Sequence, residues 1–118
     1  MPYVDGFVIP IARSKVPAYR RMAQKAGKVW KRYGALEFRE CVGDDLNVKM
    51  GKSFPSLARA KRGETVFFSY IVYRSKAHRN QVNAKVMKDP SMADMDMKDM
   101  PFDVRRMAYG GFKVLVDI

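Results

Sequence analysis

The sequence predicts an α+β domain that spans residues 1–118, with a four-stranded antiparallel sheet and the element order β-α-β-β-α-β. Two observations lead to this prediction. Segments 3–11 and 65–74 carry apolar side chains on both faces, which is typical of strands at the centre of a sheet. Between them, residues 15–33 repeat apolar side chains at the period of a helix that packs one side against a sheet.

The N-terminal part is expected to form a strand at residues 3–11 and then a long helix to about Tyr33. Ser14 is expected to cap this helix, Pro17 fits its first turn, and Gly34 supplies its C-terminal stop. One arc of the helix is apolar, with basic residues opposite. The apolar arc contains Val16, Tyr19, Met22, Ala23, Ala26, Val29, Trp30 and Tyr33.

The next segment, residues 35–42, alternates apolar and polar side chains, which indicates an edge strand with one polar face. A connection is expected at 43–63, with a helical turn near 54–59, and then a strand at 65–74. A helix from the Ser75 cap to Lys88, a connection at 90–103 and a last strand at 106–118 follow. Gly110 and Gly111 interrupt the last strand, which indicates a bulge or a close backbone approach. This is the split βαβ, or ferredoxin-like, arrangement, with sheet order 4-1-3-2. The two strands that are apolar on both faces are then the central ones.

Two helices cover only one face of such a sheet. The other face would expose Phe, Ile, Tyr and Val side chains, and a patch of that size is uncommon on a soluble monomer. A second copy, packed sheet to sheet, is the simplest cover, since twofold dimers are the commonest oligomers. We therefore expect a homodimer with a barrel-like core.

The composition is that of a globular protein, with 47% hydrophobic and 30% charged residues. The single cysteine, Cys41, excludes an internal disulfide framework, and the apolar runs are too short to cross a membrane. Asp5 interrupts the apolar stretch that a signal peptide needs. We expect a cytoplasmic protein without a membrane partner.

The strongest charge feature is segment 6–36, which contains eight basic residues and no acidic one, in a chain of net charge +11. On the predicted helix, Arg21, Lys25, Lys28 and Arg32 form a stripe that either binds a polyanion such as RNA or is a solvated face. RNA-recognition domains share the predicted element order, but segment 62–65 lacks their aromatic RNP1 pattern. Nucleic acid is therefore a possible partner that the pattern does not favour.

Four ordered motifs carry a family resemblance: YVDGFV from Tyr3, ECVGDD from Glu40, VNAKVM-x-DP from Val82, and MPFD followed by RRM-x-YGGF from Met100. The chain resembles the YbaA-like family of small uncharacterised bacterial proteins over nearly its whole length. That family belongs to the dimeric α+β barrel superfamily, so the resemblance implies the same dimer. It implies no established activity, although distant superfamily members include cofactor-free monooxygenases, isomerases and haem-handling proteins.

Two side chains are candidates for acid–base chemistry. Asp5 lies on an apolar face of a central strand, where it would be either a general base or the partner of an arginine such as Arg105 or Arg106. His78 is the only histidine, so it is either the one histidine base available or a solvated residue in the first turn of its helix. The sequence leaves these alternatives open.

A pocket for a small aromatic molecule is expected between the sheet and the first helix. Trp30 and Tyr33 lie on the inner face of that helix, while Arg106 and Tyr109 belong to the last strand. A stripe at helical spacing is also explained simply as core. A cofactor-independent oxygenase or isomerase, which deprotonates its substrate in a water-excluding pocket, is the enzymatic form of this hypothesis.

No resident cofactor or metal is expected. One histidine and one cysteine exclude the usual zinc sets, and no haem attachment motif is present. Cys41 is expected to be inert, although Arg39 two residues away could activate it. A mixture of soft thioethers and hard carboxylates suits no single metal, so we expect a packing loop. The residues of that mixture are Met92, Asp94, Met95, Asp96, Met97, Asp99 and Met100.

Overall fold

The structure is a computed structural model that describes residues 1–93, 95 and 97–118. Four strands form one antiparallel sheet in the order β2-β3-β1-β4. The strands are β1 (Tyr3–Ala12), β2 (Glu37–Val42), β3 (Glu64–Tyr73) and β4 (Ala108–Lys113). The helices are α1 (Val16–Arg32), α2 (Phe54–Ala58), α3 (Lys76–Lys88) and α4 (Pro90–Ala93). The predicted ferredoxin-like order, with strands one and three central, is confirmed.

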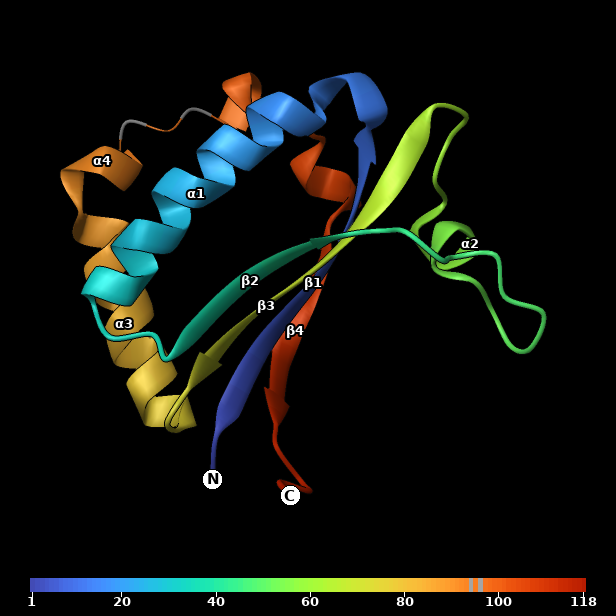
Figure 1. The fold of residues 1–118 in the computed structure, drawn as a ribbon. Helices are drawn as coiled ribbons and strands as arrows, with labels where there is room; N and C mark the ends of the chain where they lie inside the picture. The colour runs from blue at the N-terminus through green and yellow to red at the C-terminus, as the bar shows by residue number, and fades with distance from the viewer. Residues whose placement is uncertain (94, 96) are drawn as a thin grey trace.

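The two long helices, α1 and α3, lie on the same side of the sheet (Figure 1). The short helix α2 lies in the connection that projects past one end of the strands, and the two termini lie close together at the other end. Two buried clusters hold the helices to the sheet. One contains Val29, Ile71, Tyr73, Val82 and Val86; the other contains Ile9, Ile11, Tyr19, Ala23 and Phe67.

The register places two rows of side chains across the helix-covered face. Glu40, Ser69, Phe7 and Tyr109 form one row, because they pair in that order across β2, β3, β1 and β4. Phe38, Ile71, Asp5 and Gly111 form the next row. Since side chains alternate along a strand, these rows point at α1 and α3.

Most predicted helix ends are confirmed. Ser75 caps α3 by accepting a hydrogen bond from the His78 backbone N–H at 3.1 Å, and Gly34 follows α1 with a φ of +113°. The expected cap at Ser14 is wrong. Residues Arg13–Lys15 form a 3₁₀ turn, so Lys15 occupies the N-cap position of α1.

The last strand is shorter than expected. Arg106 lies in a 3₁₀ turn, Val104–Arg106, which the Asp103 side chain caps. Pairing with β1 runs out at Lys113, opposite Tyr3, because β1 begins there. Gly110 and Gly111 pair regularly with β1, so there is no bulge within this described strand. Gly111 instead allows a side chain to approach: a Cβ there would lie 2.3 Å from the hydroxyl oxygen of Tyr3.

None of the helices in the described part of the chain is long and apolar enough to cross a bilayer.

Candidate functional site

A cavity of about 460 Å³ lies between the helix-covered face of the sheet, α1, α3 and the methionine-containing segment after α3; we call it the inner cavity. The two sheet rows form its floor. Most of its lining is aromatic or thioether, so it is apolar with a few polar groups among the apolar ones. The apolar lining includes Phe7, Ile9, Met22, Trp30, Phe38, Met92, Met95, Met100, Phe102 and Met107.

Asp5 stands on this floor and is 8% exposed. Its partner is Arg79 of α3, whose Nε lies 3.7 Å from Asp5 Oδ1, and not the expected Arg105 or Arg106. Arg79 also donates from Nη2 to the Tyr3 hydroxyl at 3.2 Å, and its guanidinium sits 5.0 Å from the centre of the Tyr3 ring. A cation over an aromatic face is favourable. The Arg79 Nε is nevertheless buried without a hydrogen-bond acceptor among the described residues.

Trp30 is fixed in the cavity wall by its ring nitrogen. Nε1 donates to the Tyr73 hydroxyl oxygen and to Asn83 Oδ1, each at 3.1 Å, and the Tyr73 hydroxyl also contacts Asn83 Oδ1 at 3.2 Å. Burial raises the pKa of Tyr73, and the Asp5 charge raises it further. Tyr73 therefore stays neutral and can keep bridging Trp30, on α1, to α3.

Glu40 is another polar group of the cavity, and it was not among the residues predicted from the sequence. Its Oε1 accepts from the Tyr19 hydroxyl at 2.7 Å and from the Ser69 hydroxyl. Burial raises the pKa of Glu40, while the two hydrogen bonds oppose that shift. The alternation of side chains along the strand could have identified Glu40. Position 40 falls on the same face as the apolar Phe38 and Val42, where a carboxylate is unusual.

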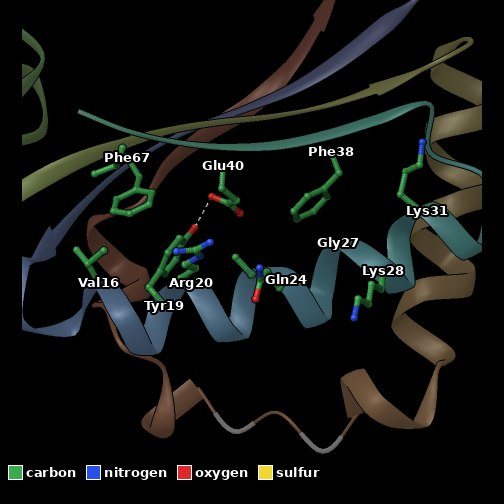
Figure 2. Close-up of a pocket in the computed structure, with 12 residues that line it drawn as sticks. Val16, Tyr19, Arg20, Gln24, Gly27, Lys28, Lys31, Phe38, Glu40 and Phe67 are labelled. Atoms are coloured by element: carbon green, nitrogen blue, oxygen red, sulfur yellow. Dashed lines mark hydrogen bonds between the residues drawn. The ribbon is translucent and has the colours of Figure 1, made fainter. Parts of the chain in front are cut away.

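A second cavity, of about 730 Å³, lies between α1 and β2; we call it the outer cavity. Figure 2 shows Tyr19 and Glu40 toward one end and Lys28 and Lys31 toward the other. Tyr19, Phe38 and Glu40 line both cavities, so they form the wall between the two.

The expected ligand residues are only partly brought together. Asp5, Trp30 and Tyr109 line the inner cavity, and Tyr109 is 72% exposed and stacks on Phe7 with ring centres 6.0 Å apart. Tyr33 instead donates to Asp89 at 2.7 Å. Arg106 forms a bidentate pair with Glu64 at 2.7 and 2.8 Å.

His78 lies away from both cavities. It is 8% exposed, and its Nδ1 accepts a hydrogen bond from the Arg74 backbone N–H at 3.0 Å, so the expectation of a solvated residue is wrong. Burial lowers the pKa of His78, and the nearby charges of Arg74 and Lys85 lower it further. The ring therefore caps the turn before α3 as a neutral acceptor.

The basic stripe of α1 faces outward. Arg21, Lys25 and Lys28 are exposed, and Arg32 bonds to Asp89 at 3.2 Å while its side chain remains 60% exposed. Asp89 also accepts from Ser91 and Tyr33, and these hydrogen bonds lower the pKa of Asp89 to about 2. This carboxylate joins the C-terminal ends of α1 and α3.

No group of three or more His, Cys, Asp or Glu side chains suited to a metal occurs among the described residues. Cys41 is exposed on β2. Met92, Met95 and Met100 pack toward the inner cavity. Asp94 and Asp96, which the sequence analysis considered as metal ligands, lie outside the described residues.

Residues 2–104 match the model of a family described as "Protein of unknown function (DUF1428)". The chain belongs to this family. It is 43% identical over 117 residues to the "Uncharacterized protein YbaA" of Escherichia coli K12, with 99% of each chain covered, and equally so to the Shigella flexneri protein of the same name. The resemblance to the YbaA-like family is thereby confirmed.

Two solved structures share the DUF1428 chain's fold. An uncharacterised NIPSNAP domain protein from Burkholderia xenovorans has a TM-score of 0.61 at 17% identity, covering 95% of this chain and 93% of its own. A dimeric ferredoxin-like protein from an uncultured marine organism has a TM-score of 0.57 at 12% identity, with both chains fully covered. At these identities the likeness shows a common fold and nothing about activity.

Proposed function

We propose that this protein binds a small aromatic molecule in the inner cavity. The observation that carries the proposal is an apolar cavity whose few polar groups converge from three elements: Asp5 on β1, Glu40 on β2 and Arg79 on α3. Ligand sites in proteins are commonly concave and apolar with a small number of such groups. A volume of about 460 Å³ suits one or two aromatic rings.

The chemistry of the ligand follows from one buried donor, the Arg79 Nε, which has an ion-pair partner in Asp5 but no hydrogen-bond acceptor among the described residues. A buried donor without an acceptor costs stability, so the Arg79 Nε favours a ligand with an oxygen acceptor. Trp30, Phe7 and Phe38 offer faces and edges for ring stacking. A phenol or hydroquinone combines an aromatic body with oxygens that both donate and accept.

The test uses phenol, hydroquinone and indole as probes, with protein labelled by ¹³C at the methionine methyl groups. Binding in the inner cavity should shift the signals of Met22, Met92 and Met100, and it should quench the single tryptophan, Trp30. Ala26 lines the cavity, so Ala26→Phe fills it and should abolish these shifts; Ala84→Phe makes the same change on an exposed position of α3 and should not. Shifts that persist in Ala26→Phe would refute the inner cavity as the site.

The enzymatic form of the proposal is proton abstraction from a bound hydroquinone, followed by its oxidation to quinone with dioxygen reduced to hydrogen peroxide. Two carboxylates line the cavity, Asp5 and Glu40, and burial raises the pKa of Glu40, so its ionised form is a stronger base than an ordinary carboxylate. An oxygen electrode measures the reaction. Equal turnover in wild type, Asp5→Asn and Glu40→Gln would exclude both carboxylates as the catalytic base. His78→Ala tests the histidine as the third candidate for that base.

We further propose that the protein works as a homodimer in the cytoplasm, with the uncovered sheet faces packed together. Phe68 and Phe112 are 46% and 61% exposed on that face, beside Val4, Val8 and Tyr70. The fold relative described as dimeric supports this assembly. Phe112→Ser should yield a monomer in light scattering, whereas Tyr109→Ser, on the opposite face of β4, should not. A concentration-independent monomer in the wild type would refute the dimer.

The alternative function is polyanion binding by the outward stripe of α1. Its support is that Arg21, Lys25 and Lys28 are all exposed on a helix with no acidic residue. Affinity for poly(A) RNA should then fall steeply with salt concentration. If charge reversal at these three positions leaves the affinity unchanged, this alternative is wrong.

A further inference from the structure

Glu40 is the acidic side chain of the inner cavity that has no cation beside it. Asp5 has Arg79 as its ion-pair partner at 3.7 Å. Within the part of the chain that the structure describes, no lysine or arginine nitrogen lies within ion-pair distance of Glu40. Its two hydrogen bonds come from neutral hydroxyl groups: Tyr19 donates to Oε1 at 2.7 Å (Figure 2), and Ser69 donates to the same oxygen. A carboxylate accepts about four hydrogen bonds, so capacity remains for a donor on a ligand.

An unpaired carboxylate in an apolar cavity is costly, and a cationic ligand group reduces that cost. Glu40 is half-buried, and burial raises the pKa of its carboxyl group, because the charged form is poorly solvated there. A hydrogen bond that joins two charged groups is about twice as strong as one between neutral groups. Among ligand groups that donate, a primary ammonium therefore gains more from Glu40 than a hydroxyl does.

Two arginines lie near Glu40 in the fold, and neither takes the place of a ligand cation. Arg20 is exposed and lines the outer cavity but not the inner one, so it lies beyond the wall that separates the two cavities. Water screens its charge there. Arg39 lines the inner cavity but alternates with Glu40 along β2, and its guanidinium pairs with Glu37 at 3.3 Å on the uncovered face. An ammonium group that reaches Glu40 from the inner cavity therefore meets neither guanidinium directly.

Aromatic side chains line the inner cavity around Glu40. Phe7 lies in the same sheet row, two strands away. Tyr19 and Phe38 line the cavity next to the carboxylate. The face of an aromatic ring attracts a cation, and the attraction is strongest where water is excluded. The rings thus offset part of the hydration that an ammonium group loses on entering the cavity.

The distance between Glu40 and Asp5 limits the length of the ligand. The two residues lie two strands apart, because β2 and β1 both pair with β3, and their partners Ser69 and Ile71 are offset by two residues. Standard sheet spacings then place the two Cα atoms about 12 Å apart, with both side chains on the same face of the sheet. A single phenol can contact only one of the two carboxylates. A phenol with an arm of two carbon atoms between its ring and an ammonium group can contact both.

We infer that the ligand of the inner cavity is a phenolic primary amine, whose hydroxyl lies at Asp5 and Arg79 and whose ammonium group donates to Glu40. The inference rests on the proposed function, since it concerns the same cavity and retains the phenol. It adds the ammonium group and the length of the molecule. Both are absent from phenol, hydroquinone and indole, so those probes can bind even where this inference is wrong.

Three probes with the same phenol ring test the end group: tyramine ends in an ammonium, tyrosol in a hydroxyl, and 4-hydroxyphenylpropanoate in a carboxylate. The shifts of the methionine methyl signals that test the proposed function also give the three dissociation constants. Tyramine should bind about tenfold more tightly than tyrosol, because its hydrogen bond to Glu40 joins two charges, and the acid should bind most weakly. The net charge of +11 attracts the acid at long range, so a preference for tyramine reports a local acidic group.

Two glutamate variants on β2 assign the ammonium end. Glu40→Gln leaves an oxygen that accepts from Tyr19 and Ser69, so it should reduce the affinity for tyramine to that for tyrosol and change the affinity for tyrosol by less than about twofold. Glu37→Gln removes the same charge from the opposite face of the strand, where the side chain is 47% exposed, and should keep the preference for tyramine. A preference that survives Glu40→Gln, or that Glu37→Gln lowers equally, would overturn the inference.

The outcomes separate this inference from the proposed function. If the three probes bind equally and Ala26→Phe abolishes the binding of all three, the cavity binds phenols as proposed, but the ammonium group has no role and the inference is wrong. If none of the probes binds, the proposed function and the inference both fail. If tyramine binds to Ala26→Phe as tightly as to the wild type, it occupies another site, and the inference is wrong as well.

Discussion

The pair formed by Arg106 and Glu64 gives the most quantitative prediction. Arg106 Nη1 and Nη2 donate to the two Glu64 carboxylate oxygens at 2.7 and 2.8 Å, and Nη2 also donates to the Arg59 carbonyl at 3.0 Å. The two side chains are 23% and 13% exposed. The pair joins the start of β3 to the turn before β4, so its loss should lower the stability of the fold.

An upper limit on the magnitude follows from the pKa of Glu64, which the hydrogen bonds from Arg106 and, to a smaller extent, the one from the Lys61 backbone N–H lower from 4.5 to about 2. At about 1.36 kcal/mol per pKa unit this corresponds to about 3 kcal/mol. The hydrogen bond from Lys61 remains in the variant and solvent screens the exposed part of the pair, so we expect Arg106→Gln to lower the free energy of unfolding at pH 7 by about 1 to 2 kcal/mol. Urea denaturation followed by circular dichroism measures this difference.

The pH dependence gives a second check. Because the pKa of Glu64 is lowered in the folded protein, the contribution of the pair is complete above pH 4.5 and is lost as the pH falls toward about 2. The gap between wild type and Arg106→Gln should therefore be constant from pH 7 to pH 5 and narrow below it. Arg105→Gln is the control, since that side chain is 89% exposed and should cost less than about 1 kcal/mol.

A gap that is equal for the two arginine variants, or that does not change with pH, would refute this reasoning.

Three further predictions concern other contacts. Gly111→Ala should destabilise the fold by about 1 to 3 kcal/mol, because the new Cβ would overlap the buried Tyr3 ring. Gly110→Ala is the control: the nearest contact of its Cβ is at 4.0 Å, so stability should change by less than about 0.5 kcal/mol. Equal urea midpoints for the two variants would contradict the overlap. Glu40→Gln should be more stable than wild type at pH 8. The pKa of Glu40 is raised in the folded protein, so the wild type loses stability as the pH rises above the ordinary pKa of a glutamate, and the difference should shrink toward pH 4. A variant that is less stable than wild type at pH 8 would contradict this. Asp89→Asn should be less stable than wild type at pH 7, because the pKa of Asp89 is lowered to about 2 in the folded protein. The gap in thermal denaturation should narrow as the pH falls from 3.8 toward about 2. A gap at pH 2 as large as the gap at pH 7 would argue against a role for the charge.

The location of the inner cavity was predictable in outline. The sequence placed Asp5 on an apolar face of a central strand and Trp30 on the inner face of α1, and both line that cavity. Local pattern is sufficient there, because the periods of strand and helix determine which side chains face each other. It was insufficient for Arg106 and Tyr33, whose partners Glu64 and Asp89 lie 42 and 56 residues away in the chain.

The chain by itself determined the element order, the central position of β1 and β3, the one-sided placement of the helices and the family, because each depends on residue periodicity or on motifs in sequence order. Only the tertiary structure decided that Arg79 pairs with Asp5 and that Glu40 stands in the wall between two cavities. The physical reason is that these groups come from strands and helices far apart in the chain. Their charges acquire partners, and their pKa values shift, only after the sheet register and the packing of α1 and α3 bring them together.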